Sequence, residues 1–350
     1  MQEEVLKNIN ALLITNPTNI RYLTGFVGVE NRDAYCLQTK DETYLFTYDL
    51  YREEAKKVKA TFVEISRENP ISRELAKLAA KLRIKKLGFE DANLTVAELA
   101  KLRKELSGVK LVPTRDRIEA MRMIKRPDEI ENIRLAANVT DQCFSYIIKR
   151  IRPGVTEGRL AWEIESFLKM KAGDVAFSPV VAFNENSSQP HYHKRGNNPL
   201  QKNSLILLDF GARVNGYCAD MTRVVFFGTP KPEWIKAYNA VLTANERALE
   251  LLKGGERNGA TLDAAAKEVI AETDLPPYPH SLGHAVGLAI HESPRLTVKK
   301  KETLKPNMVV TVEPAVYIEG SYGVRIEDLV LLKENNIDTL SKSPKEIITL

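Results

Sequence analysis

The segment Ser204–Asp220, with the sequence S-L-I-L-L-D-F-G-A-R-V-N-G-Y-C-A-D, predicts a β-hairpin around which the C-terminal part of the chain is organised. Leu205–Leu208 is an unbroken apolar run typical of a buried strand, and Met221–Phe227 continues the segment as a second run rich in β-branched and aromatic residues. Between the runs lies Asn215–Gly216, a dipeptide that strongly favours a two-residue hairpin turn. We therefore expect two antiparallel strands joined at this turn.

The register of this hairpin brings two aspartates together. A two-residue turn pairs Val214 with Tyr217. The same register places Asp209 opposite Thr222, which lies two residues from Asp220. Both carboxylates then point to one face, as diagonal neighbours about 7–8 Å apart at Cα. Like charges so placed repel each other unless a cation joins them, so the hairpin predicts a metal site.

A second predicted hairpin repeats this arrangement with glutamates. The apolar strand Met308–Val312 leads to Glu313, and the strand Tyr322–Leu332 carries Glu327. A turn centred on Gly320 places the two glutamates directly opposite each other, on one face. The second hairpin therefore supplies a second pair of carboxylates.

Each of these acids, taken alone, has a purely structural explanation. Asp209 could cap a turn, and Asp220 could pair with Arg223. Glu327 could simply face solvent. Four carboxylates at the ends of apolar strands, in two hairpins whose registers point each pair inward, favour joint metal binding instead. The register of the second hairpin also places Arg325 on the face of the glutamates.

The five histidines all lie between positions 191 and 291. His284, in the segment P-H-S-L-G-H-A-V-G, is the candidate for an imidazole ligand beside the carboxylates. A carboxylate-rich site with one imidazole suits Mn²⁺, Co²⁺, Fe²⁺ or Zn²⁺, and two such cations about 3.5–4 Å apart could share a hydroxide for hydrolysis. His191, His280 and His291 are candidates for moving protons and holding an oxyanion. His193 lies in a polar, basic stretch that is typical of a surface loop.

Composition excludes several classes of protein. The 350 residues are 43% hydrophobic and 28% charged, which is typical of a globular chain long enough for two domains. A net charge of +5 without a basic block gives no indication of nucleic-acid binding. Three cysteines without CxxC spacing favour a reducing, cytoplasmic setting. An acidic N-terminus and the lack of a long apolar run predict an unexported protein that does not bind membranes.

The order of strands and helices predicts two domains. Residues 1–115 alternate short apolar strands with helices, as in a compact α/β domain. Residues 116–128 predict a helical linker, because a charged, helix-favouring segment meets Pro127 at a typical first helical position. Residues 129–350 begin with long helices and continue mainly as strands that carry the acids and histidines, which predicts an α+β domain.

The motifs around the proposed ligands resemble those of the pita-bread metallopeptidases, which include Xaa-Pro dipeptidases (prolidases), Xaa-Pro aminopeptidases and methionine aminopeptidases. The matching positions are Asp209 in L-L-D-F-G-A, Asp220 in A-D-M-T-R, His284 in G-H-A-V-G, Glu313 in V-E-P and Glu327 in R-I-E-D. The resemblance implies a C-terminal pita-bread domain with two divalent metal ions, Mn²⁺ or Co²⁺ being favoured and Zn²⁺ or Fe²⁺ being alternatives. It implies that Asp220 and Glu327 bridge both metals. Asp209 would complete one metal site, and His284 with Glu313 would complete the other.

The resemblance extends over nearly the whole chain. Ala11–Phe26, with the sequence A-L-L-I-T-N-P-T-N-I-R-Y-L-T-G-F, is similar to the creatinase/prolidase N-terminal domain, which methionine aminopeptidases lack. Arg122–Ala137 is similar to the domain junction of the family. Size and layout most resemble the short prolidases of heat-loving archaea, which implies small domains and a homodimer.

The resemblance also implies roles for residues around the metals. His191 would assist substrate binding and proton transfer, and His291 would contact the scissile carbonyl or the intermediate. Arg295 matches a position that, by the resemblance, would hold the free carboxylate of the proline residue. His280 and Arg325 are assigned to substrate binding as well. The segment before His191 lacks the glycine-rich run common in the family, which leaves the choice between dipeptidase and aminopeptidase open.

The sequence therefore predicts a metal-dependent hydrolase that cuts Xaa-Pro dipeptides with a hydroxide held by two metals. Glu313 is expected to pass a proton towards the leaving nitrogen. The first alternative is an Xaa-Pro aminopeptidase that acts on longer peptides. A homologue that only binds peptides and a creatinase-like enzyme that works without metal are the others, and the retention of all ligand positions disfavours both.

Overall fold

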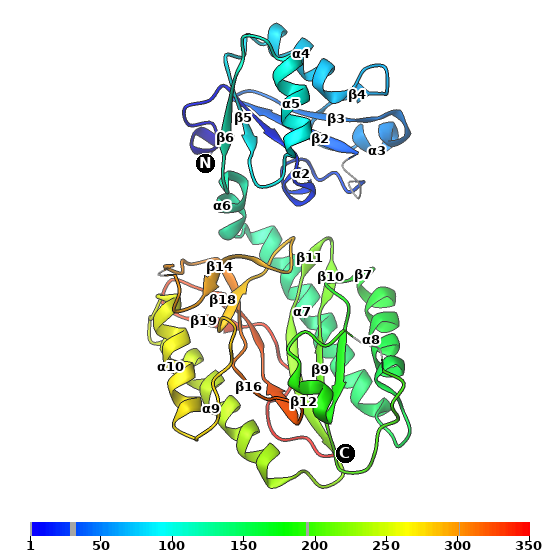
Figure 1. Ribbon diagram of the computed structural model, residues 1–350, viewed down its shortest axis with the longest axis vertical. Helices are drawn as coiled ribbons and strands as arrows, with labels where there is room; N and C mark the ends of the chain where they lie inside the picture. The colour runs from blue at the N-terminus through cyan, green and yellow to red at the C-terminus, as the bar shows by residue number, and fades with distance from the viewer. Residues whose placement is uncertain (1, 29–32, 194–195, 301) are drawn as a thin grey trace. The chain divides into compact units, whose positions relative to one another are not determined.

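The chain folds into two compact units, residues 1–122 and 123–350 (Figure 1). The computed structural model describes residues 2–28, 33–193, 196–300 and 302–350. The division between the units falls inside the segment 116–128, which the sequence assigns to a linker. That segment contains the helix α6 (Arg117–Met123) and the first residues of α7 (Pro127–Ile147).

Unit 1 is built around a six-stranded sheet with the strand order β4-β3-β2-β1-β5-β6. The strands are β1 (Ala11–Ile14), β2 (Ala34–Thr39), β3 (Thr43–Tyr48), β4 (Thr61–Ile65), β5 (Lys86–Glu90) and β6 (Lys110–Thr114). The helices before α6 are α1 (Gln2–Val5), α2 (Pro17–Thr24), η1 (Asp49–Tyr51), α3 (Arg52–Ala55), α4 (Ile71–Lys81) and α5 (Val96–Glu105). Leu13 belongs to one apolar cluster and Leu12 and Ile14 to another, so side chains that alternate along β1 are buried on both faces of the sheet. The α/β prediction for this part of the chain is confirmed.

Unit 2 begins with two long helices whose starts follow from the local sequence. In α7, Pro127 occupies the first turn and acidic residues follow it, which suits the positive end of the helix dipole. The helix α8 (Glu157–Ala172) begins at Thr156, whose hydroxyl accepts a hydrogen bond of 3.1 Å from the backbone N–H of Arg159. The remaining helical segments are η2 (Ile148–Arg150), η3 (Asn184–Ser188), α9 (Pro232–Lys253) and α10 (Gly259–Ala271).

The strands of unit 2 lie between the helix pair α7–α8 and the helix pair α9–α10 (Figure 1). The sheets have the orders β12-β9-β8, β11-β10-β7, β14-β13-β15-β18-β19 and β16-β17. Their bounds are β7 (Asp174–Val175), β8 (Val180–Phe183), β9 (Ser204–Phe210), β10 (Ala212–Val214), β11 (Tyr217–Cys218), β12 (Met221–Phe227), β13 (Gly283–Ala285), β14 (Glu292–Leu296), β15 (Val309–Val312), β16 (Ala315–Ile318), β17 (Tyr322–Arg325), β18 (Asp328–Leu332) and β19 (Ile337–Thr339). One buried apolar core joins side chains of β9, β12, α9, α10 and β15 to β18. This arrangement confirms the α+β pita-bread prediction.

The aspartate hairpin has the predicted register. Val214 pairs with Tyr217 across the turn at Asn215–Gly216, and both turn residues have positive φ, as the two-residue turn requires. Asp209 lies opposite Thr222 in the ladder between β9 and β12.

The glutamate hairpin has the predicted register but is not continuous. Residues 322–332, expected as one strand, form β17 and β18, which belong to different sheets. The break lies opposite Pro314, which has no N–H to donate to a ladder. The backbone N–H of Glu327 instead donates to the carbonyl of Thr222, at 3.1 Å. The interruption thus joins the glutamate hairpin to the aspartate hairpin.

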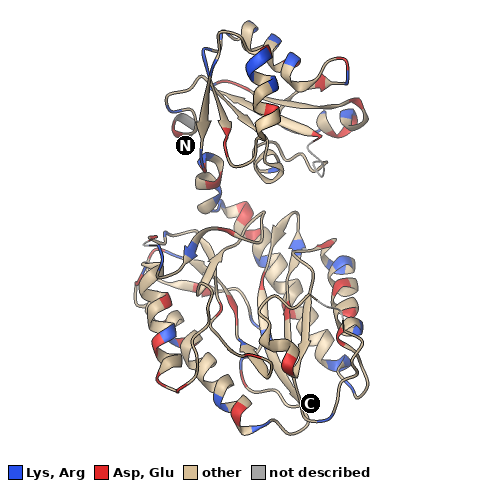
Figure 2. Ribbon diagram, viewed as in Figure 1, with Lys and Arg blue, Asp and Glu red and all other residues tan. Residues whose placement is uncertain are grey.

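The distribution of charged residues and the character of the helices concern nucleic-acid binding and membrane binding, which the sequence analysis does not predict. Acidic and basic residues alternate along the helices of unit 2 (Figure 2). In the part of the chain that the structure describes, no helix combines the length and the apolar character needed to cross a bilayer.

Candidate metal centre

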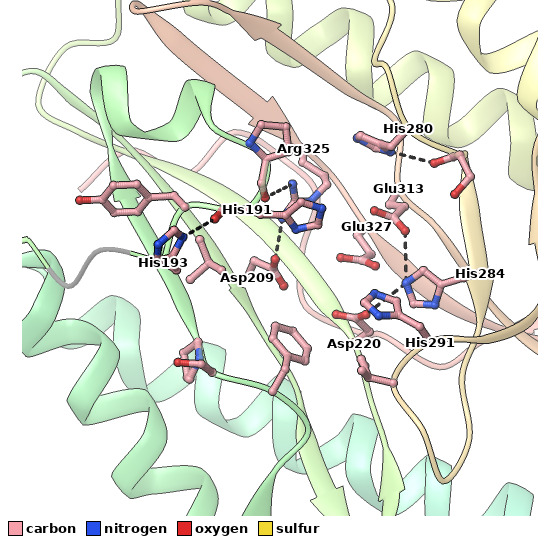
Figure 3. Close-up of a pocket in the computed structure, with 18 of the residues that line it drawn as sticks. His191, His193, Asp209, Asp220, His280, His284, His291, Glu313, Arg325 and Glu327 are labelled. Carbon is pink, nitrogen blue, oxygen red and sulfur yellow. Dashed lines mark hydrogen bonds and ion pairs between the residues drawn. The ribbon is translucent and has the colours of Figure 1, made fainter. Parts of the chain in front are cut away.

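A cavity of about 370 Å³ in unit 2 is lined by every residue that the sequence analysis selects for the site. Figure 3 shows the acids and histidines directed towards one another across this cavity. The acids, His284 and His291 come from β9, the segment before β12, β13, the loop before β14, and the breaks that follow β15 and β17, whereas His191 follows η3 and His280 precedes β13. Positions more than a hundred residues apart in the chain therefore meet at one point.

The centre of the cavity holds Asp220, His284 and Glu327. Each of these residues offers one ligand atom, and the three atoms lie within 4.8 Å of one another. His284 Nε2 is 3.6 Å from Asp220 Oδ2 and 3.4 Å from Glu313 Oε1. Oxygen and nitrogen atoms at this separation can ligate one cation after small shifts.

Backbone contacts orient the His284 ring for ligation. Its Nδ1–H donates to the carbonyl of Ala285 at 3.1 Å, so Nε2 carries the free lone pair that faces the carboxylates. The backbone N–H of His284 donates to Thr311 Oγ1 at 3.0 Å, and the Thr311 hydroxyl donates to Glu313 Oε1 at 3.2 Å. Burial lowers the pKa of His284 to about 3, which keeps the imidazole neutral, as a ligand must be.

The carboxylates of the site are crowded and buried. Burial, followed by repulsion from the other acids, raises the pKa values of Asp220 and Glu327 well above their usual range. Burial also raises the pKa of Asp209, and it raises that of Glu313 to about 7. Such a cluster is unfavourable when fully ionised without a cation.

Asp209 shows most directly that the site fits a metal. Its Oδ2 accepts a hydrogen bond of 2.6 Å from Arg325 Nη2. Its Oδ1 is buried and has no hydrogen-bond partner among the residues that the structure describes. A buried carboxylate oxygen left in this way is costly unless a cation completes its coordination.

A layer of polar side chains behind the acids was missed by the sequence analysis. The Thr222 hydroxyl donates to Glu327 Oε2 at 2.6 Å and accepts from Arg325 Nε at 3.0 Å. Arg325 Nη1 donates to the Tyr317 hydroxyl at 2.6 Å, and that oxygen lies 3.3 Å from His280 Nε2. Thr222 and Tyr317 are the two residues of this layer that the sequence analysis did not select. The alternation of side chains along a strand could have indicated them, because Thr222 lies opposite Asp209 and Tyr317 shares the face of residues 313 and 315.

The remaining selected residues, His191, His291 and Arg295, line the cavity and are exposed, so they lie where it opens to solvent. The ring of His291 meets that of His284 edge to face, with centroids 4.5 Å apart. His191 and Arg295 are exposed residues of the cavity wall. His193 is exposed too, and its Nδ1 lies 3.2 Å from the backbone carbonyl of His191.

Comparison with known proteins assigns both units. Residues 4–124 match the Creatinase/Prolidase N-terminal domain, and residues 131–334 match Metallopeptidase family M24. The chain belongs to metallopeptidase family M24. An Xaa-Pro dipeptidase of Pyrococcus furiosus is 32% identical to this metallopeptidase over 349 residues, which cover 97% of this chain and 96% of that protein.

Two solved structures resemble this M24 metallopeptidase closely. One is an Xaa-Pro dipeptidase from Bacillus anthracis, with a TM-score of 0.92, 33% identity, and coverage of 100% of this chain and 98% of that chain. The other is an X-Pro aminopeptidase from Thermotoga maritima, with a TM-score of 0.90, 32% identity, and coverage of 100% of both chains. The likeness extends to a dipeptidase and an aminopeptidase almost equally.

The pKa shifts predict how pH affects the metal-free metallopeptidase. Burial raises the pKa of Glu313 from 4.5 to about 7, so its folded state holds a proton that the unfolded chain has released, and stability falls as pH rises through 7. Burial lowers the pKa of His280 from 6.5 to about 4 and that of His284 to about 3, so these groups lower stability only when pH falls below 6.5. Above pH 6.5, the change of stability with pH at this site therefore comes from the carboxylates and not from these histidines.

We therefore expect the melting temperature of the metal-free protein to fall between pH 6.5 and pH 8 by more than about 2 °C, the shift that roughly 1 kcal/mol causes in a unit of this size. Scanning calorimetry with and without saturating Mn²⁺ measures this, because the bound cation removes the repulsion. An equal fall in both forms would show that other groups cause it.

Proposed function

We propose that this metallopeptidase hydrolyses Xaa-Pro dipeptides with two divalent metal ions. The observation that carries the proposal is the cavity in which four carboxylates and one oriented imidazole converge. The proposed ligands are Asp209, Asp220, His284, Glu313 and Glu327. The P. furiosus relative, an Xaa-Pro dipeptidase, supports the substrate class.

The depth of the acids supports two metals with shared ligands. Glu327 is 2% exposed and the Asp220 side chain 7% exposed, whereas the side chains of Asp209 and Glu313 are 13% and 15% exposed. The deeper pair lies between Asp209 on one side and His284 with Glu313 on the other (Figure 3). This is the placement expected of two bridging carboxylates with terminal ligands on each side.

The donor set also restricts the metal. Four oxygen donors and one nitrogen donor, without a thiolate, favour Mn²⁺ or Co²⁺ and allow Zn²⁺ or Fe²⁺. When bound, such cations would polarise the scissile carbonyl and lower the pKa of a water that attacks it.

The chain's own residues would then bind the peptide and move protons. Glu313, next to His284 and hydrogen-bonded by Thr311, is placed to pass a proton to the leaving nitrogen, which in an Xaa-Pro bond carries no hydrogen. His191 and His291 at the cavity mouth would assist proton transfer and hold the carbonyl oxygen.

The two arginines of the cavity have different surroundings. The guanidinium of Arg325 donates hydrogen bonds to Asp209, Thr222 and Tyr317. These bonds would fix the Asp209 and Tyr317 side chains, and Arg325 also lines the cavity that would bind substrate. The guanidinium of Arg295 makes no hydrogen bond to another described residue. We propose that Arg295 binds the free carboxylate of the substrate, and that His280 contacts substrate beside it.

The second candidate is an Xaa-Pro aminopeptidase, which the likeness to the T. maritima structure supports. It would share the metal ligands and accept a chain beyond proline. The proposal also includes a cytoplasmic setting, which the three cysteines without CxxC spacing favour, and a homodimer, which the resemblance to the short archaeal prolidases supports.

A direct comparison of peptides tests this proposal. After chelation and addition of Mn²⁺, Co²⁺ or Zn²⁺, we expect the protein to cleave Xaa-Pro dipeptides at least about 10-fold more efficiently than Xaa-Pro-Xaa tripeptides, the discrimination that one charged hydrogen bond of roughly 1.5–3 kcal/mol can supply. The chelated protein is expected to be inactive. Equal or better cleavage of tripeptides would establish the aminopeptidase instead.

Arg295→Met is expected to remove this preference. The variant should raise KM for the dipeptide about 10- to 100-fold, because an ion pair with the substrate carboxylate is lost. Arg152→Met, a change at an exposed arginine away from the cavity, is the matched control. An unchanged KM in Arg295→Met would contradict the assignment.

A further inference from the structure

A buried ion pair lies behind the loop that carries His291. Lys125 Nζ is 3.2 Å from Glu292 Oε2, and the two side chains are 1% and 6% exposed. Burying two charges costs several kcal/mol each unless their mutual attraction compensates. The neighbouring chain segments that this ion pair contacts therefore indicate its role.

The Glu292 carboxylate fills the inside of the loop 286–291. Its Oε1 accepts a hydrogen bond of 3.0 Å from the backbone N–H of Ala289. A Cβ atom at Gly287 would lie 2.7 Å from both carboxylate oxygens, so a larger residue here would displace the carboxylate. The glycine at the end of G-H-A-V-G therefore makes room for Glu292.

The loop itself places His291 against the metal centre. It connects β13, which carries His284, to β14, which begins at Glu292. Its first half is anchored to the sheet, because Val286 N–H donates to Val309 and Cys218 N–H donates to Gly287. In its second half, the hydrogen bond from the Ala289 N–H to the Glu292 carboxylate and the pairing of Glu292 with Ala285 between β13 and β14 flank His291, whose exposed ring meets that of His284 edge to face.

Lys125 ties this loop to the segment at which unit 2 begins. Its backbone N–H donates to the carbonyl of Asn307 at 2.9 Å, and its Nζ lies 3.4 Å from the carbonyl of Met123. The residue falls between the segments 4–124 and 131–334 that the two family profiles match. Lys125 supplies the positive charge that faces the Glu292 carboxylate in this buried place.

We propose that Lys125 and Glu292 are positioning residues that hold the loop 286–291 and thereby set His291 beside His284. The inference rests on the proposed function, because it concerns the alignment of His291 for that hydrolysis. A displacement of about 1 Å in an aligned group can lower a rate about 10²-fold.

The test uses Lys125→Met, Glu292→Gln and the double variant in the full-length, metal-loaded protein. Each single change leaves one buried charge without its partner, and we expect kcat to fall about 10- to 100-fold with KM and bound metal within about 3-fold of the unchanged protein. The double variant removes both charges and should recover at least about 3-fold of that loss. Arg134→Met, which breaks an ion pair with Asp338 outside the cavity, should leave kcat unchanged.

Amide hydrogen exchange supplies a readout that does not depend on activity. Peptides covering residues 286–292 should exchange faster in both single variants, and less so in the double variant. Unchanged exchange in this loop, or a double variant as impaired as the product of the two single effects, would overturn the proposal. If the unchanged protein cleaves no Xaa-Pro peptide, the proposed function fails, and the exchange data still decide whether the pair holds the loop.

Discussion

Asp220→Asn is expected to abolish metal-dependent hydrolysis, lowering kcat/KM by roughly 10³-fold, which corresponds to about 4 kcal/mol of lost transition-state stabilisation. The amide has the shape of the carboxylate but lacks its charge. Asp220 contributes to the central group with His284 and Glu327, whose ligand atoms lie within 4.8 Å of one another. Loss of the central charge should weaken both proposed metal sites, so bound metal, measured by elemental analysis after dialysis, should fall with the activity.

The same substitution should stabilise the metal-free protein. Burial and the neighbouring acids raise the pKa of Asp220 well above its usual range, so an uncharged side chain relieves a repulsion that the folded state otherwise contains. We expect the melting temperature in chelator to rise by at least about 2 °C. Asp338→Asn, at a surface carboxylate paired with Arg134, is the matched control. It should change neither the amount of bound metal nor the activity, and it should not raise the melting temperature in chelator. An Asp220→Asn protein that keeps its metal and its activity would rule out the assigned role.

These opposite effects separate a lost ligand from a damaged fold. A substitution that merely disturbs packing lowers activity and stability together. A buried acid that binds a cation lowers the stability of the metal-free chain, because its charge is repelled by the other acids. It raises the stability of the metal-loaded chain, because the bound ion stabilises only the folded state. The orphaned Oδ1 of Asp209 and the crowding of Asp220 and Glu327 are consistent with such a site.

Short-range rules were sufficient to predict the two hairpins. The turn at Asn215–Gly216 determines which residue lies opposite Asp209, because register in a hairpin follows from the length of its turn. The pairing of Ala315 with Arg325 likewise has the register expected from a turn at Gly320. Spacing along a strand then decided which side chains share a face.

Contacts between distant segments could not be predicted in this way. At the break between β17 and β18, the N–H of Glu327 donates to the carbonyl of Thr222, which lies in another sheet. The pair of Lys125 and Glu292 joins residues 167 positions apart, through burial that no local pattern reveals. The sequence signals polar residues at such places, but only the packing of the sheets shows which of them meet.

Glu313→Gln is the second substitution for which we expect a large effect. Its carboxylate is the most exposed of the four acids, with 15% of the side chain accessible, and it lies 3.4 Å from His284 Nε2. It is therefore both a proposed ligand and the acid best placed to exchange a proton with substrate. A glutamine retains an oxygen for the cation but cannot carry the proton, so kcat should fall about 10²- to 10³-fold.

The distribution of the effect between binding and turnover tests the proton-transfer role. If Glu313 transfers a proton in the transition state, kcat and kcat/KM should fall equally while KM stays within a few-fold of its original value. Loss of metal alone should be reversed by raising the Mn²⁺ concentration, whereas loss of the proton carrier should not. Glu319→Gln, the same chemical change at an exposed position six residues further along the chain, is the control and should retain full activity. Near-normal turnover of Glu313→Gln with metal bound would exclude Glu313 as the proton donor and leave it as a ligand only, in which case His191 or His291 at the cavity mouth must supply the proton to the leaving nitrogen.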